Sequence, residues 1–366
     1  MKLLSSLCGV IVALAIVATA SAQAEQVKKP GVIFRVPDSY TFAVALSADG
    51  KLLARAGINK VDLWDVASGK ELHTLKGHSE RLFKLAFSPD GKTLASATGH
   101  WGDPGGAGEV KLWDVATGKE GAPVKGHPTP VFSNLAFSAD GKTLATSGGT
   151  VKLWDVATGK EKMELGDGAW SLAFSPDGKT LAMGVGGFMA ENDAKPGSVQ
   201  LWDLTTGKKR ASMPGHQNGD LSIGFTPDGK TLVTAGDTEL KLWDVATAKE
   251  RATIVIPGDS PPQFFPLAFT ADNNTLIAAI WTVYEKEKEG GLSVQHWDLA
   301  TGKARATFWA PVNPGSNNAG IFFAALSADG KTVAWGGEEK KPKYMGTAYV
   351  WDVQSLATSA PKLPKE

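Results

Sequence analysis

Two short phrases alternate along the chain, seven times each, and this regularity constrains the fold more than any other feature. The first phrase centres on a Trp-Asp pair, as in VKLWDVATGKE at 110–120, which returns unchanged at 151–161. The second is a turn phrase such as FSPDGK at 87–92. The Trp-Asp pairs lie at 64–65, 113–114, 154–155, 202–203, 243–244, 297–298 and 351–352. A repeat of 41 to 54 residues predicts an architecture built from one recurring supersecondary unit.

Each unit has the pattern of four β-strands. Apolar residues alternate on both sides of the turn phrase, which predicts a β-hairpin whose Gly adopts the left-handed conformation. The segment VKLWDV is rich in β-branched and aromatic residues, as a third strand would be. A turn follows, and segments such as LHTLK at 72–76 form the fourth strand. A sheet of this kind has two apolar faces, which it buries by packing against neighbouring sheets.

The two phrases together resemble the WD-repeat β-propeller family over about residues 31–353. The resemblance implies that each Trp-Asp pair ends the third strand of a blade, and that a ring of seven blades is the common closed form. We therefore expect an all-β, seven-bladed β-propeller with four-stranded antiparallel blades. The export signal described below makes it similar to exported bacterial-type members of the family.

The two chain ends are predicted to meet in one blade. Only 14 residues follow Asp352, and Pro361 and Pro364 are among them, which disfavours a final strand there. The segment GVIFRV at 31–36 precedes the first turn phrase at the distance that separates fourth strands from turn phrases elsewhere. We predict that this N-terminal strand pairs in the last blade and closes the ring.

The amino terminus has the pattern of an export signal. Lys2 is the only charged residue before Glu25, and an apolar stretch from about residue 10 to 18 is followed by small residues. This pattern predicts cleavage near Ala22 or Ala24 and a periplasmic or secreted protein. The alternative is an N-terminal membrane anchor, because 22 uncharged positions at 3–24 are long enough to span a bilayer.

We divide the chain into a signal peptide (1–22), a short linker (23–30), the propeller (31–355) and a flexible C-terminal tail (356–366). After cleavage no membrane span is expected. Lys and Arg total 38 and Asp and Glu total 38, so no overall basic charge attracts nucleic acid. We expect a monomer whose partner is a protein or a peptide.

Cysteine and histidine usage predicts neither a metal site nor a cofactor. Cys8 is the only cysteine, so the cleaved chain would have no disulfide, zinc–thiolate site or cysteine nucleophile. The six histidines show no spacing typical of metal ligands, and the glycine-rich stretches lack the Lys-Ser/Thr of a phosphate-binding loop.

The family resemblance also implies a buried hydrogen-bonded chain. In the family, a His that follows Gly before the first strand joins a second-strand Ser or Thr, the third-strand Trp and an Asp in the preceding turn. One unit matches all four positions, with His216, Thr234, Asp237 and Trp243. A catalytic triad is the alternative, but a nucleophile inside a strand favours a structural role.

Extra chain is inserted at connections that emerge at one end of a propeller. The insertions lie at 99–109, 184–198, 257–266, 281–293, 310–320 and 336–348. Aromatic residues on loops of a rigid scaffold are typical interface anchors. The candidate partner-binding residues are Trp101, Phe188, Trp281, Tyr284, Trp309 and Tyr344. The alternative is that these side chains fold back and cover the loops.

These features favour a non-catalytic scaffold that binds a protein or peptide at its loop-rich end and uses no cofactor. One alternative is an exported propeller enzyme, of hydrolase, lactonase or dehydrogenase type, with a site at the central tunnel. Another is a purely structural, envelope-associated module. The fold alone does not decide among them.

Overall fold

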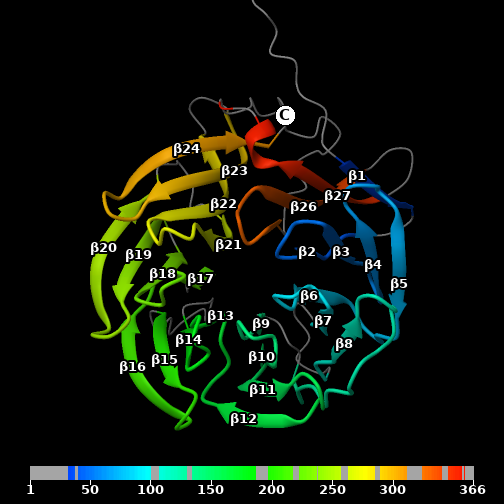
Figure 1. Cartoon of the computed structure of the whole chain (residues 1–366), viewed down its shortest axis with the longest axis horizontal. Coiled ribbons are helices and arrows are strands. Elements are labelled where there is room, and N and C mark those ends of the chain that lie inside the picture. Colours follow the sequence, from blue (N-terminus) through cyan, green and yellow to red (C-terminus); the bar gives the residue numbers. More distant parts are fainter. Residues whose placement is uncertain are drawn as a thin grey trace, which may run out of the picture.

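In the computed structural model, the chain forms a ring of seven β-sheets, and each sheet is one blade (Figure 1). The structure describes residues 32–37, 40–99, 107–129, 134–186, 197–216, 222–236, 238–256, 263–284, 289–310, 324–339, 345–356 and 358. The predicted all-β, seven-bladed propeller is confirmed.

Blades are numbered in chain order, and each begins with its innermost strand. Blade 1 contains β2 (Ala43–Leu46), β3 (Leu52–Ala56), β4 (Lys60–Asp65) and β5 (Glu71–Lys76). Blade 2 contains β6 (Leu82–Phe87), β7 (Thr93–Thr98) and β8 (Val110–Asp114). Blade 3 contains β9 (Leu135–Phe137), β10 (Thr143–Ser147), β11 (Val151–Asp155) and β12 (Glu161–Leu165). Blade 4 contains β13 (Ser171–Phe174), β14 (Thr180–Val185), β15 (Ser198–Asp203) and β16 (Lys208–Pro214).

The remaining three blades complete the ring. Blade 5 contains β17 (Ser222–Phe225), β18 (Thr231–Gly236), β19 (Glu239–Asp244) and β20 (Lys249–Val255). Blade 6 contains β21 (Gln263–Phe269), β22 (Thr275–Tyr284), β23 (Glu289–Asp298) and β24 (Lys303–Trp309). Blade 7 contains β25 (Ala324–Leu326), β26 (Thr332–Glu339), β27 (Met345–Asp352) and β1 (Val32–Pro37), and a 3-10 helix (Val353–Ser355) follows β27.

The turn phrase recurs because its polar side chains fix the hairpin. In blade 2, Ser88 Oγ donates to Asp90 Oδ1 at 2.6 Å, and the backbone N–H groups of Lys92 and Thr93 donate to the same two side chains. Gly91 has φ +69°, a conformation that side chains with a Cβ rarely adopt. The same Ser/Thr-to-Asp hydrogen bond is present in all seven turn phrases.

The Trp-Asp phrase has a similar explanation. Every Trp-Asp pair ends the third strand of its blade, as predicted. Asp114 Oδ1 accepts hydrogen bonds from Thr117 N at 2.8 Å and Thr117 Oγ1 at 2.7 Å, which fixes the turn to the fourth-strand position. The Trp side chain is buried at the junction with the preceding blade, so the pair combines a turn-fixing acid with a core residue.

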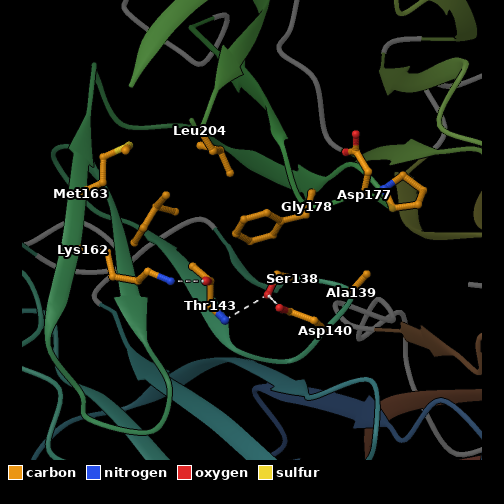
Figure 2. Close-up of a pocket in the computed structure, with 12 residues that line it drawn as sticks. Ser138, Ala139, Asp140, Thr143, Lys162, Met163, Asp177, Gly178 and Leu204 are labelled. Atoms are coloured by element: carbon orange, nitrogen blue, oxygen red, sulfur yellow. Dashed lines mark hydrogen bonds between the residues drawn. The ribbon is translucent and has the colours of Figure 1, made fainter. Parts of the chain in front are cut away.

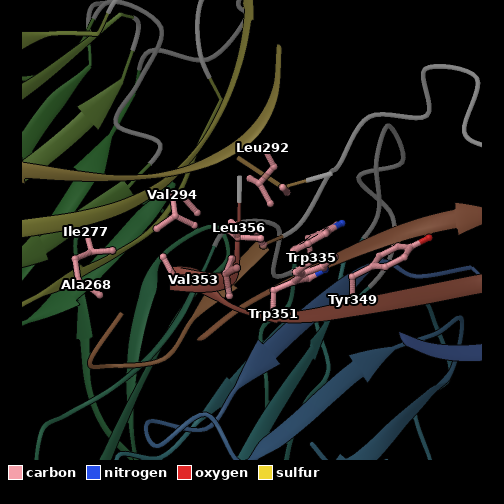
Figure 3. Close-up of a cluster of buried hydrophobic side chains, with 13 residues drawn as sticks. Ala268, Ile277, Leu292, Val294, Trp335, Tyr349, Trp351, Val353 and Leu356 are labelled. Atoms are coloured by element: carbon pink, nitrogen blue, oxygen red, sulfur yellow. The ribbon is translucent and has the colours of Figure 1, made fainter. Parts of the chain in front are cut away.

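Seven buried apolar clusters hold the ring together, and each cluster spans one junction between neighbouring blades. The junction of blades 6 and 7 is the largest, with Leu292 and Val294 facing an aromatic stack (Figure 3). In that stack the Trp335 ring lies 5.5 Å from Tyr349 and 6.1 Å from Trp351, centroid to centroid. No blade has a core of its own, so the blades stabilise one another.

The N-terminal strand closes the ring as predicted. β1 pairs antiparallel with β27 from Val32↔Val350 to Pro37↔Met345, and it is the outermost strand of blade 7 (Figure 1). Phe34 is buried, and its ring centroid lies 5.2 Å from that of Trp64 in blade 1. The packed chain continues to Leu356, at the start of the expected tail, which is buried against blades 6 and 7.

Blade 2 departs from the four-strand pattern within the described residues. At the position of its outer strand, the chain makes only single bridges, between Trp113 and Glu120 and between Gly108 and His127. Pro123 lies between these bridges, and proline lacks the N–H that a strand would donate. The peptide carbonyls of this segment instead approach Gly159 of blade 3 so closely that a Cβ there would lie 2.2 Å from Pro123 O.

Two of the expected insertions are strands rather than loops. In the described parts of 281–293 and 336–348, β22 and β23 are extended to ten residues each, and β26 and β27 to eight residues each. Insertions of this type lengthen the hairpin because paired backbone groups continue the ladder.

Removing the strand that closes the ring should destabilise the whole protein. Deletion of residues 32–36 leaves the outer edge of β27 without a partner strand. Phe34→Ala alone should cost about 3 to 5 kcal/mol, because a large buried side chain is lost. Thermal unfolding followed by circular dichroism should show a midpoint lowered by roughly 10 °C for Phe34→Ala. The matched control is Leu72→Ala, an apolar side chain that is 38 % exposed on β5. An unchanged melting curve for the deletion would rule out ring closure by β1.

Candidate functional site

The antiparallel order of the strands gives the ring two different ends. Connections from first to second strand and from third to fourth strand emerge at one end, which we name the turn end because the Asp-containing turns lie there. Connections from second to third strand, and from one blade to the next, emerge at the opposite end, which we name the loop end. All six predicted insertions belong to the loop end.

The structure describes three of the six predicted partner-binding residues. Trp281 and Tyr284 are on the extended end of β22, paired with Leu292 and Glu289 of β23. Trp309 is the last residue of β24 and is only 5 % exposed, which fits the alternative of covering the scaffold. Trp101, Phe188 and Tyr344 lie outside the described residues.

Exposed apolar side chains of the described chain concentrate at the loop end. Tyr40 precedes blade 1, Ile58 is in the turn between β3 and β4, and Val255 ends β20; they are 37 %, 45 % and 67 % exposed. The fourth large exposed apolar residue, Leu72, is near the turn end of β5. Sequence reasoning missed these three residues because none of them lies within an insertion: Tyr40 and Ile58 are on short connections, and Val255 is in β20.

Aromatic rings and an arginine connect blades 1 and 2 at the loop end. Tyr40 and Phe42 have ring centroids 6.0 Å apart, and Phe42 and Phe83 are 5.7 Å apart. The guanidinium of the exposed Arg81 lies 5.6 Å from the Phe42 ring centroid, at a distance typical of a cation–π contact. We name Tyr40, Phe42, Arg81 and Phe83 the aromatic–arginine patch.

A buried ion pair supports this patch from below. Arg55 and Asp62 are almost completely buried, and Arg55 Nη1 donates to Asp62 Oδ2 at 2.8 Å. Arg55 Nη2 donates to the Tyr40 carbonyl oxygen at 2.7 Å and Nε donates to Thr41 Oγ1 at 2.8 Å. A buried charge requires such complete pairing. These hydrogen bonds from Arg55 fix the position of residues 40 and 41, and with them the backbone that carries the exposed Tyr40 side chain.

The His, hydroxyl and Trp contacts of the predicted network are present in blade 5, and the same three contacts recur in blades 2 and 3. In blade 5, His216 Nε2 lies 3.1 Å from Thr234 Oγ1, and Trp243 Nε1 donates to the same oxygen at 3.1 Å. Asp237, the predicted acid of this network, lies outside the described residues. The matching contacts are His78–Ser96–Trp113 at 2.7 and 2.8 Å and His127–Thr146–Trp154 at 2.6 and 2.8 Å.

An acid that sequence reasoning missed completes the network in blade 2. His78 Nδ1 lies 3.0 Å from Glu109 Oε2, four residues before Trp113. Since the carboxylate only accepts, Nδ1 carries the proton, and Nε2 accepts from Ser96, whose oxygen accepts from Trp113. Glu239, four residues before Trp243, lies 3.7 Å from His216 Nδ1. The shared spacing Glu-x-x-x-Trp was the available signal.

The burial of the network argues for a structural role. Ser96, Thr146 and Thr234 are completely buried within second strands, and each hydroxyl oxygen is already engaged by His and Trp. A nucleophile must reach its substrate, whereas these hydroxyl groups contact only their own blade. The network instead satisfies buried polar groups in the blade interior.

Other blades place different side chains at the same second-strand position. Arg55 occupies it in blade 1, and Ala278 and Trp335 occupy it in blades 6 and 7. Among the described residues, the buried Nε1 groups of Trp297 and Trp351 have no hydrogen-bond partner, because no hydroxyl stands at that position. The side chain at this second-strand position therefore differs from blade to blade.

Two further features concern ligands and membranes. Among the residues that the structure describes, no group of three or more His, Cys, Asp or Glu side chains is arranged to hold a metal ion. Within the same residues, no helix has the length and apolar character that crossing a bilayer requires.

Comparison with known proteins agrees with the repeats and the fold. The family model described as "WD domain, G-beta repeat" matches residues 69–114, 118–155 and 207–244. These matches and the seven-bladed ring identify the chain as a WD-repeat β-propeller.

Three relatives each match one segment of 56 to 62 residues of the chain. An uncharacterized WD repeat-containing protein of Synechocystis sp. is 46 % identical over 56 residues, 15 % of this chain and 16 % of the relative. A probable serine/threonine-protein kinase of Thermomonospora curvata, PkwA, is 43 % identical over 61 residues, 16 % of this chain and 8 % of the relative. The small ribosomal subunit protein RACK1z of Arabidopsis thaliana is 44 % identical over 62 residues, 17 % of this chain and 19 % of the relative. The matched segments thus span less than a fifth of each relative.

The network of blade 3 predicts a specific acid sensitivity. Burial and the charge of Lys152 lower the pKa of His127 to about 4. Because the folded pKa lies below the unfolded value of 6.5, this His favours the folded state at neutral pH. That contribution, about 3 kcal/mol, is lost as pH falls from about 6.5 to 4.

A carboxylate beside His127 should reduce this sensitivity. Thr150 stands four residues before Trp154, where blades 2 and 5 have Glu. Thr150→Glu should raise the pKa of His127 and lessen the acid loss by about 1 to 2 kcal/mol relative to the neutral control Thr150→Gln. Urea unfolding at pH 7, 5.5 and 4 measures the difference, and equal pH profiles for the two variants would contradict this account.

Proposed function

We propose that this WD-repeat propeller is a non-catalytic scaffold that binds a protein or a peptide at its loop end. Propellers of WD repeats are in general protein-interaction scaffolds, and the repeat is the element that the chain shares with its relatives. The printed names of the relatives include a probable kinase and a ribosomal-subunit protein, so they support the scaffold class rather than a particular activity.

The aromatic–arginine patch is the observation that carries the proposal. Interface hot spots are enriched in aromatic residues and arginine, and the patch combines Tyr40 and Phe42 with Arg81. The exposed Ile58 is at the same end of blade 1. Exposed apolar area gains free energy when a partner removes it from water. At the turn end, by contrast, the turns carry charged and hydroxyl side chains that hydrogen-bond within their own turns.

Rigidity favours binding at this patch. The buried Arg55 holds the Tyr40 carbonyl and the Thr41 hydroxyl, and Thr41 Oγ1 donates to Thr347 O of blade 7 at 3.1 Å. The patch is therefore anchored to both blades that meet at the ring closure. A preorganised surface loses less conformational entropy on binding than a loose loop.

Affinity purification with matched variants tests the proposal. Tagged wild-type protein, the double variant Tyr40→Ala/Arg81→Ala and the turn-end control Leu72→Ala are recovered from the cells that make the protein. Partners identified by mass spectrometry should be lost, by about tenfold or more, from the double variant and retained by the control. Identical partner sets for all three proteins would contradict binding at the loop end.

We also propose that the protein is exported, with cleavage near Ala22 or Ala24. Support comes from the uncharged segment 3–24 and the small residues at its end. N-terminal sequencing of the mature protein should begin at Gln23 or Glu25. A chain that keeps its first residues and stays in the membrane fraction would favour the membrane-anchored alternative.

A further inference from the structure

A cavity opens at the turn end, on the face opposite the aromatic–arginine patch. It lies between blades 3 and 4 and has a volume of about 330 Å³ (Figure 2). Leu153 and Met163 of blade 3 and Phe174 and Leu204 of blade 4 supply its apolar surface. Met163 and Leu204 lie close together on one side, and Lys162 reaches the cavity from β12 (Figure 2).

The junction at this cavity lacks a polar bridge that two other junctions have. His73 Nε2 lies 3.1 Å from Ala116 O across blades 1 and 2, and Arg210 Nη2 donates to Val245 O at 2.5 Å across blades 4 and 5. At the equivalent positions of blade 3, Met163 has no donor, and Lys162 Nζ donates to Thr143 Oγ1 of its own blade at 3.0 Å. The junction of blades 3 and 4 therefore has no such bridge at these positions.

Lys162 makes no ion pair within the described chain. Its ammonium donates to a neutral hydroxyl, and no described carboxylate lies within ion-pair distance of it. By contrast, Lys152 in the same blade pairs with Glu161 at 2.8 Å and Glu164 at 3.5 Å. A cation without an ion-pair partner, beside an apolar surface, is suited to an anion that carries an apolar group.

Two aspartates at the rim do not reverse this preference. Asp140 Oδ1 accepts from Ser138 Oγ at 2.6 Å and from Lys142 N at 3.0 Å, and Asp177 is engaged in the same way by Ser175 and Lys179. The lysine side chains that act on these carboxylates are Lys142, Lys162 and Lys179. The charge of Lys162 also acts on Asp155, which accepts from Thr158 N at 2.9 Å and Thr158 Oγ1 at 2.8 Å. All three carboxylates are therefore engaged in their own turns.

We propose that the cavity binds a small amphipathic carboxylate. Its apolar group would lie against Met163, Phe174 and Leu204, and its carboxylate would accept a hydrogen bond from Lys162 Nζ. The volume is at the small end of ligand cavities and suits one aromatic or branched group. The flexible Met163 side chain adapts to the shape of that group. A free organic acid and the C-terminal residue of a peptide both supply this chemistry.

Isothermal titration with 4-phenylbutyrate and its neutral amide tests the charge requirement on the full folded protein. The acid should bind, and the amide should bind at least about tenfold more weakly. Lys162→Met should weaken binding of the acid by a similar factor. Lys160→Met, which removes an exposed lysine of the same blade outside the cavity, should change it less than about twofold. Melting curves that match the wild type show that both variants are folded.

A dipeptide pair distinguishes the two sources of the ligand. N-acetyl-leucyl-phenylalanine is compared with its C-terminal amide and with 4-phenylbutyrate. Tighter binding of the dipeptide acid supports recognition of a peptide end, and tighter binding of 4-phenylbutyrate supports a free acid. Equal affinity for acids and amides, unchanged binding by Lys162→Met, or no binding of either acid at millimolar concentration would overturn the proposal. Tyr40→Ala/Arg81→Ala should leave this binding intact, so the result is independent of the loop-end function.

Discussion

The burial of both faces of each sheet by neighbouring blades is the constraint on which the whole structure depends. All seven apolar clusters lie at junctions, and none belongs to a single blade. An open row of such sheets would expose two apolar faces, whereas a ring exposes none. The recurring phrases follow from this constraint, because each copy supplies one turn-fixing Ser/Thr–Asp pair and one Trp that is buried, or half-buried for Trp202, at a junction.

The same constraint separates structure from function on this chain. The residues buried at the junctions are apolar in every blade. The second-strand position two residues after the partner of the Trp instead carries Arg55, Ser96 or Ala278 in different blades. These choices decide how polar groups are satisfied inside each blade. Side chains at the two ends of the ring are less constrained by this burial, and there the aromatic–arginine patch of blades 1 and 2 and the cavity between blades 3 and 4 occur, at opposite ends.

The fold was predictable from the sequence because the repeat encodes it locally. The turn phrase, the Trp-Asp pair and the distance from the segment 31–36 to its first turn each fix one piece of the blade. The outer segment of blade 2 was harder to predict, since one proline between two bridges changes the pairing. Glu109 was missed because the contact depends on the side chain's reach from the start of a strand. At the cavity, Lys162 bonds within its own blade, whereas Arg210 at the equivalent position bonds to the next blade, and the sequence alone does not reveal this difference.

Native-state hydrogen exchange resolved by blade tests the central claim most directly. If the blades are stable only through their junctions, the second and third strands of all seven blades should exchange with one common free energy, equal to that of global unfolding. Open repeat arrays instead unfold in separate segments. Protection that is lost independently in one blade, while its two neighbours keep theirs, would contradict a ring sealed by mutual burial.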